Sequence, residues 1–158
     1  MSLGVTYMST ELVKVYESRS GPKTTVLWVS RHPPLKSQIT ELEKKLDSIE
    51  VYQLSGVIPS AEYVVEVVRK VNAKIVVPVL PLSMIARLAE LSRNYGFTVV
   101  LAKMESIATT KNLEEAKKLV AEKPEARTTA TYADGVIRVF EFKGFEKLVR
   151  VELVTEPL

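Results

Sequence analysis

The chain has 158 residues, 46% of them hydrophobic, and a formal net charge of +3, which is sufficient for one domain with a sizeable core. It has no cysteine, one histidine and two aspartates, so thiol chemistry is excluded and no metal site is expected. Its 22 basic residues are interspersed with 19 acidic ones, which makes nucleic acid an unexpected partner. The absence of cysteine favours a reducing, cytoplasmic setting. No apolar run reaches the length of a membrane span, so a cytoplasmic protein without membrane contact is predicted.

The chain is predicted to form a single domain in three parts: an N-terminal extension (1–22), a series of βα units (23–123) and a C-terminal β-meander (124–158). We expect the first seven residues to be flexible and residues 12–16 to form a short strand. The high apolar content indicates that a second subunit covers part of the surface, so we also expect a homodimer.

Four apolar runs rich in β-branched residues alternate with segments of helical spacing, a pattern typical of parallel βαβ units. The runs are residues 25–30, 51–54, 74–80 and 97–103. Three of them are almost continuously apolar, as strands covered by helices on both faces are. We therefore predict a Rossmann-like three-layer α/β/α fold with a mostly parallel sheet.

The segments between these runs have apolar residues at spacings of three and four, which predicts helices over 35–46, 64–71 and 84–95. Gly96 suits the C-terminal stop of the third helix. A fourth helix is expected over 112–122, where Asn112 and Glu115 have the spacing of a capping box. Each helix presents one apolar stripe that is suited to packing on a sheet.

After Pro124 the pattern changes to an antiparallel meander with strands at 129–133, 136–142 and 148–154. Asp134 and Gly135 are predicted to form the turn between the first two strands, with both residues at positive φ. Ile137, Val139 and Glu141 are expected to share one face. This meander either extends an edge of the sheet or pairs two subunits.

Candidate functional residues follow the strands, because ligands of open parallel sheets bind beyond the carboxyl ends of the strands. Ser30, Arg31 and His32 follow the first strand, Ser55 and Gly56 the second, and Pro81 and Ser83 the third. If the strand order is 3-2-1-4, the loops after the first and fourth strands converge. The predicted ligand-binding residues are then Ser30, Arg31, His32, Lys103, Glu105 and Ser106.

These six residues suit a phosphate or carboxylate ligand, because two cations and an imidazole meet there. No catalytic residue is assigned. His32 is the candidate general base, oriented by Glu105, but an N-cap or a hydrogen-bonded loop residue is the interpretation we favour for it. The loop after the first strand has no glycine, so a dinucleotide fingerprint and a Walker-type loop are both excluded. No cofactor is assigned.

The aromatic residues of the chain are interpreted mainly as core. Trp28 lies inside the first strand, where core packing with a partner for its indole N–H is expected. Tyr132, Phe140, Phe142 and Phe145, with Arg127, Arg138, Lys143 and Arg150 nearby, also have the composition of a stacking platform for single-stranded nucleic acid. Core or interface packing is the interpretation we favour for these aromatic residues too.

The stretch 26–38, VLWVSRHPPLKSQ, resembles the opening of small uncharacterised prokaryotic proteins in which Ser-Arg-His-Pro and a helix follow the first strand. This resemblance implies a Rossmann-like fold and no established activity. The general layout is also similar to that of ligand-sensing Rossmann-like domains of CRISPR-associated regulators, which bind cyclic oligonucleotides across a dimer. That similarity is one of architecture alone.

The sequence supports three hypotheses of function. The first is a small-ligand or nucleotide-binding module, non-catalytic or regulatory, whose pocket binds an anionic small molecule through Arg31 and His32. The second is a structural or interaction protein that oligomerises through the C-terminal meander. The third is a small enzyme that uses His32 as acid or base.

Overall fold

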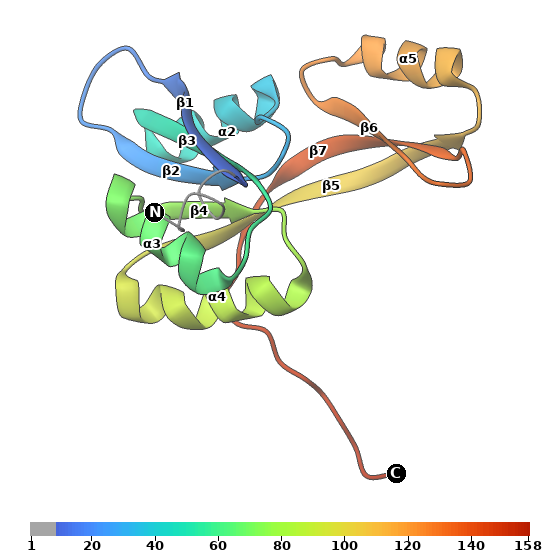
Figure 1. The fold of residues 1–158 in the computed structure, drawn as a ribbon. Coiled ribbons are helices and arrows are strands. Elements are labelled where there is room, and N and C mark those ends of the chain that lie inside the picture. Colours follow the sequence, from blue (N-terminus) through green and yellow to red (C-terminus); the bar gives the residue numbers. More distant parts are fainter. Residues whose placement is uncertain (1–8) are drawn as a thin grey trace. The chain divides into compact units, whose positions relative to one another are not determined.

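The computed structural model describes residues 9–158, and these residues form four helices and seven strands (Figure 1). The helices are α2 (Lys36–Leu46), α3 (Ala61–Val71), α4 (Leu82–Tyr95) and α5 (Leu113–Glu122). The strands are β1 (Thr10–Glu17), β2 (Thr24–Val29), β3 (Ile49–Gly56), β4 (Ile75–Pro78), β5 (Thr98–Thr110), β6 (Arg127–Thr131) and β7 (Ile137–Lys147). The predicted alternation of strands and helices between residues 23 and 123 is confirmed. The expectation for the first seven residues lies outside the described residues.

The sheet is mixed. Its strands follow the order β1-β3-β2-β4-β5-β7-β6. This order contains six pairs of neighbouring strands, and among residues 9–158 only three of them are parallel: β2 with β3, β2 with β4 and β4 with β5. At the two ends of the sheet β1 pairs antiparallel with β3 and β6 pairs antiparallel with β7. The predicted Rossmann-like three-layer α/β/α fold with a mostly parallel sheet is therefore wrong, and the fold is a mixed α/β one.

Two segments account for this difference. The predicted N-terminal extension contains β1, an eight-residue strand that pairs with β3 from Thr10 opposite Gly56 to Glu17 opposite Glu50. The fourth predicted strand was expected to stop at Lys103, but β5 has 13 residues and continues to Thr110. The continuous apolar runs mark the parallel strands, whereas the added strand segments are polar or alternating and give a weaker signal.

The four central strands lie in the order β3-β2-β4-β5, so β2 is flanked by the two strands that follow it in the chain. Val26 of β2 is opposite Val51 of β3 on one side and Ile75 of β4 on the other. The order 3-2-1-4 is thus absent, and β4 separates β2 from β5. Because β3, β2 and β4 are parallel, their carboxyl ends lie at one edge, where the direction of the crossovers reverses.

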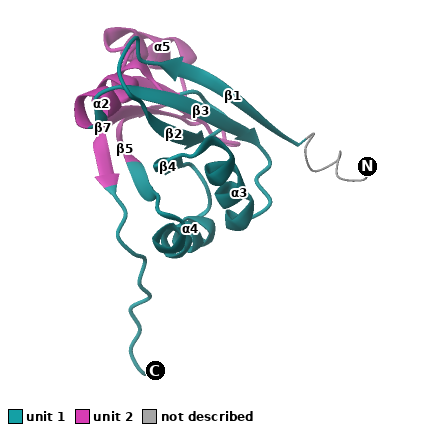
Figure 2. Cartoon of the chain, turned by 90° about the vertical axis from the view of Figure 1, so that its left-hand side faces the viewer, with its two compact units in different colours: residues 1–33, 46–101, 147–158 teal, residues 34–45, 102–146 magenta. Residues whose placement is uncertain are grey.

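The chain divides into two compact units, coloured teal and magenta in Figure 2. Of the described residues, unit 1 comprises 9–33, 46–101 and 147–158, and unit 2 comprises 34–45 and 102–146. The core of unit 1 is built from apolar side chains of β2, β3, β4, α3 and α4, with Leu27, Leu54, Val64, Val76 and Leu88 completely buried. Each of these side chains comes from one of the apolar runs or stripes seen in the sequence.

In unit 1, α3 has a cap at both ends and α4 has one at its C-terminal end. The Ser60 hydroxyl oxygen accepts a hydrogen bond from the backbone N–H of Tyr63 at the start of α3, which ends at Asn72 in the left-handed conformation. Gly96 has a φ of 70° and ends α4, as predicted. Within the described part of the chain, no helix is long and apolar enough to cross a membrane.

Unit 2 has a small core of its own, formed by Ala116, Ile137 and Val139 with partly buried side chains of β5 and α5 around it. Asn112 is confirmed as the cap of α5, since its side-chain oxygen accepts hydrogen bonds from the backbone N–H groups of Glu114 and Glu115. The reciprocal half of a capping box is not formed, because the N–H of Asn112 donates to the Thr110 hydroxyl oxygen and the Glu115 carboxylate accepts from the same hydroxyl. The predicted shared face of Ile137, Val139 and Glu141 is also confirmed, because all three are buried.

The hairpin between β6 and β7 differs from the predicted two-residue turn. The backbone N–H of Tyr132 donates to the carbonyl of Val136, which leaves a three-residue loop of Ala133, Asp134 and Gly135. Gly135 has a φ of 83°, whereas Asp134 is not at positive φ and instead accepts a hydrogen bond from the N–H of Val136. The turn is thus of the kind in which only the glycine must be left-handed.

The predicted third strand of the meander, at residues 148–154, is absent. The chain leaves β7 at Lys147 and continues to Leu158 without regular secondary structure (Figure 1). The C-terminal region of the chain is therefore a two-stranded hairpin followed by an extended segment.

Candidate functional site

A cleft of about 440 Å³ opens in unit 1 at the carboxyl ends of β2, β3 and β4. Its lining comes from residues 30–32 after β2, 56–58 around the end of β3 and 79–81 after β4, together with Val29, Leu54 and Met84. Small-molecule pockets have volumes of about 300–1,000 Å³ and, in sheets with parallel strands, lie where the strand order reverses. The cleft has both the position and the size of such a pocket.

Three of the six predicted ligand-binding residues, Ser30, Arg31 and His32, line this cleft. Their loop is held by its backbone. The N–H of Ser30 donates to the carbonyl of Leu54 at 3.1 Å, and the side-chain amide of Gln53 donates to the carbonyl of Ser30 at 2.9 Å. The N–H of His32 donates to the Ser30 hydroxyl oxygen at 3.1 Å. Arg31 and His32 themselves are exposed, so a fixed backbone presents two polar side chains to solvent.

Trp28 completes the support of this loop from inside the core. Its side chain is buried, and its indole Nε1–H donates to the carbonyl oxygen of His32 at 3.0 Å. The prediction of core packing with a partner for the indole is therefore confirmed. The loop after β2 is thus attached to the core of unit 1 by a side chain of the same strand.

The other three predicted residues, Lys103, Glu105 and Ser106, lie within β5 and not after it, and they belong to unit 2. All three are exposed, and the Lys103 ammonium lies 3.5 Å from a carboxylate oxygen of Glu146. They do not line the cleft. Because β4 lies between β2 and β5 in the strand order, the crevice inferred from neighbouring first and fourth strands is not the one that forms.

The floor and rim of the cleft are mostly apolar. Val29 and Leu54 are buried at its base, and Ile58, Leu80 and Met84 are partly exposed along its walls. At the rim Val57 and Val79 each have 62% of their surface exposed, and the adjacent Leu82 has 68%. Exposed apolar side chains gathered around one opening are typical of a binding surface. The sequence analysis identified Gly56 and Pro81, because they directly follow predicted strands. It missed the apolar residues of the cleft, because an apolar residue in a loop has no feature that marks it as part of a site.

Gly56 shapes the end of β3 at the cleft. It has a φ of 103°, and a Cβ atom at this position would lie 1.9 Å from the carbonyl oxygen of Ser9. The same carbonyl accepts a hydrogen bond from the N–H of Val57 at 3.0 Å. A glycine is therefore required here both by the backbone conformation and by the close approach of the chain that leads into β1.

Among the residues that line the cleft, the one charged side chain is the guanidinium of Arg31. No carboxylate is among its lining residues, and within the described part of the chain Arg31 forms no ion pair. Pro81 precedes α4 and makes no side-chain cap, while Pro81 and Met84 line the cleft. The positive end of the α4 dipole is therefore at the opening. Together these groups favour an anion over a cation.

A second polar cluster, in unit 2, is centred on the buried carboxylate of Glu141. The Lys143 ammonium and the Arg127 guanidinium lie 2.5 Å and 2.8 Å from its two oxygens. Hydrogen bonds from Lys143 and from Arg127 lower the pKa of Glu141 from 4.5 to about 2. Arg127 also donates to the carbonyl of Leu119 and to the carboxylate of Glu122. This cluster joins β6, β7 and the end of α5, and its charges are already paired.

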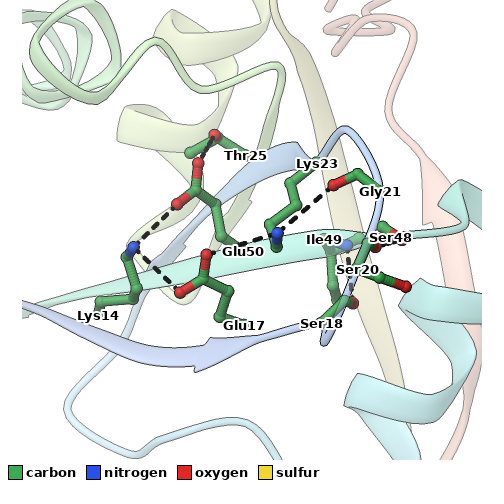
Figure 3. A network of polar contacts seen from close by, with 10 residues as sticks. All are labelled: Lys14, Glu17, Ser18, Ser20, Gly21, Lys23, Thr25, Ser48, Ile49 and Glu50. Atoms are coloured by element: carbon green, nitrogen blue, oxygen red, sulfur yellow. Dashed lines mark hydrogen bonds and ion pairs between the residues drawn. The ribbon is translucent and has the colours of Figure 1, made fainter.

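A third polar network connects β1, β2 and β3 in unit 1 (Figure 3). The Glu50 carboxylate accepts a hydrogen bond from the Thr25 hydroxyl at 2.8 Å and lies 3.1 Å from the Lys14 ammonium. These two contacts, that of Thr25 first, lower the pKa of Glu50. Glu17 bridges Lys14 and Lys23 at 3.4 and 3.6 Å. Because each charge has a partner, the network fits the role of fastening the strands better than that of a ligand site.

Of the four C-terminal aromatic residues, Phe142 and Phe145 pack on each other, whereas Tyr132 is exposed beside Arg138. The rings of Phe142 and Phe145 lie 4.9 Å apart at 59°, and the Arg138 guanidinium lies 5.6 Å from the ring of Tyr132. Two of the cations expected beside them, Arg127 and Lys143, are bound to Glu141. This arrangement supports packing over a stacking platform.

Comparisons with known proteins give no relative from which a function of this site could be inferred. No protein-family model, curated protein or solved structure gives a significant match to the chain. Among the described residues there is no group of three or more histidine, aspartate or glutamate side chains that is arranged to hold a metal ion. The cleft in unit 1 is the candidate site, because its position, its volume and the charge of Arg31 all suit the binding of a small molecule.

Proposed function

We propose that unit 1 is a binding module for a small organic anion that has an apolar part. The observation that carries this proposal is the placement of Arg31 and His32, on a loop with a fixed backbone, at the opening of a cleft of about 440 Å³ whose remaining lining is mostly apolar. A carboxylate or phosphate pairs with the guanidinium, and the apolar part of the ligand packs on residues such as Ile58 and Leu80.

The chemistry of the lining supports binding over catalysis. A general base of the histidine type needs a group that orients the imidazole, and the cleft has no carboxylate for this. Glu105, the expected partner of His32, does not line the cleft. The lining also has no aromatic side chain apart from His32, so stacking of a nucleobase is less well supported than packing of an aliphatic group.

The proposal is tested by isothermal titration calorimetry with alkyl carboxylates, alkyl phosphates and inorganic phosphate. Arg31→Ala is expected to weaken binding of the alkyl anions roughly tenfold to a hundredfold, because a charge-assisted hydrogen bond is lost. The matched control is Arg93→Ala, since Arg93 is also exposed in unit 1 but does not line the cleft. Absence of binding by every probe, or equal binding by the Arg31→Ala and unmodified proteins, contradicts the proposal.

A further inference from the structure

Residues 148–154, with the sequence LVRVELV, have the pattern of a strand but no strand partner. Apolar Val149, Val151 and Leu153 alternate with Arg150 and Glu152. The structure leaves 63% of Val149, 40% of Val151 and 94% of Leu153 exposed. Large apolar side chains exposed in one alternating row indicate a surface that is covered by another chain.

The beginning of β5 explains why this strand does not form within one chain. The N–H of Leu148 donates to the carbonyl of Val99 at 2.9 Å, and β5 begins at Thr98. Most of the segment after Leu148 therefore extends beyond the N-terminal end of β5, where that strand offers no residues to pair with. Within the described part of the chain, no backbone hydrogen bond involves residues 149–158. The N–H and C=O groups on both sides of the segment are thus available to another strand.

The segment is complementary to itself in the antiparallel direction. When two copies are aligned with Val151 opposite Val151, apolar residues face apolar residues and each charge faces its opposite. The other opposed pairs are Val149 with Leu153, Arg150 with Glu152 and Leu148 with Val154.

Neighbouring registers lose this complementarity. A slip that places Glu152 opposite Glu152 sets two carboxylates against each other, and one that places Arg150 opposite Arg150 does the same with two guanidinium groups. A slip by a single residue brings the apolar row of one copy against the charged row of the other. The order of apolar and charged residues in the segment therefore favours one register, which has twofold symmetry.

We propose that residues 148–154 pair with the same segment of a second copy of this chain, as an antiparallel ribbon about a twofold axis at Val151. In the single chain the Arg150 guanidinium lies 2.5 Å from Glu152. Pairing exchanges this contact in each of the two copies for two equivalent contacts between the copies, so the number of ion pairs is unchanged. Since a two-stranded ribbon is marginally stable alone, the dimer is reversible and depends on concentration.

Charge reversal tests the register through the dimer dissociation constant, measured by sedimentation velocity on the full chain. Arg150→Glu gives a chain with two carboxylates, and Glu152→Arg gives one with two guanidinium groups. Each variant alone is expected to dimerise on the order of tenfold more weakly, since like charges face each other twice. An equimolar mixture is expected to restore dimerisation, because opposite charges then meet only between the copies.

Cross-linking tests the position of the twofold axis. The chain has no cysteine, so Val151→Cys and Val154→Cys each introduce a single thiol. With a short bismaleimide, Val151→Cys is expected to form a covalent dimer, whereas in Val154→Cys the two thiols lie on the order of 20 Å apart and react poorly. A monomeric unmodified protein, a mixture that does not recover dimerisation, or equal cross-linking of the two variants overturns the proposal.

Discussion

Single residues at the carboxyl ends of β2 and β3 shape the cleft. The loop after β2 is held by hydrogen bonds of Ser30, His32 and Trp28, which leave the Arg31 side chain exposed at the opening. At the end of β3, Gly56 allows the chain before β1 to approach closely. Both features depend on residue type and not on secondary structure. Substitutions at these positions therefore separate the shape of the cleft from its charge.

Gly56→Ala is predicted to destabilise the protein by roughly 1–3 kcal/mol from backbone strain, with a further loss from the collision with Ser9. The control is Gly135→Ala. Gly135 has a similar positive φ of 83°, but an added methyl group would meet no other part of the chain within 4 Å, so only strain of about 1–2 kcal/mol applies. Urea denaturation of the two variants measures the difference. Equal losses would show that the approach of Ser9 does not constrain the end of β3.

At the scale of elements, the sequence predicts the existence of helices and strands better than their extent. Continuous apolar runs locate β2, β3 and β4, and capping residues such as Asn112 and Gly96 locate the helix boundaries. The length of β5 and the loss of the strand at 148–154 depend on which neighbour each segment has, and neighbours are not encoded locally. An alternating segment is a strand only where another strand runs beside it.

The contact between β6, β7 and α5 gives a prediction for pH dependence. The folded-state pKa of Glu141 is about 2, below the usual value of 4.5, so its ionised form is stabilised by folding. This contribution is complete above pH 4.5 and is lost as the pH falls toward 2. Glu141→Gln is therefore predicted to be less stable than the unmodified protein at neutral pH, with a difference that shrinks on acidification.

Chemical denaturation at a series of pH values measures this difference. Glu146→Gln is the control, because Glu146 lies in the same strand and is largely exposed beside Lys103. Its stability is expected to follow that of the unmodified protein at each pH. A difference between Glu141→Gln and the unmodified protein that stays constant down to about pH 2 is incompatible with the ion pairs described for Glu141.

At the scale of the whole molecule, strand order decides which loops can form a site. Ser30, Arg31 and His32 could be predicted because polar residues after a buried strand are recognisable along the chain. The sequence predicts Lys103, Glu105 and Ser106 for the same site only if the first and fourth strands are neighbours. The observed order places β3 and β4 beside β2, so apolar residues of two other loops complete the cleft. Half of the predicted site thus depended on a topology that local patterns do not determine.

The most direct test of the binding proposal is a titration of the ¹⁵N-labelled protein with an alkyl phosphate, followed through its assigned backbone amide resonances. We predict that the shifts concentrate on residues 30–32, 56–58 and 79–84, and that the amides of Lys103, Glu105 and Ser106 remain unchanged. Shifts that concentrate on unit 2, or an absence of shifts at the highest ligand concentration, would contradict the assignment of the cleft as the binding site.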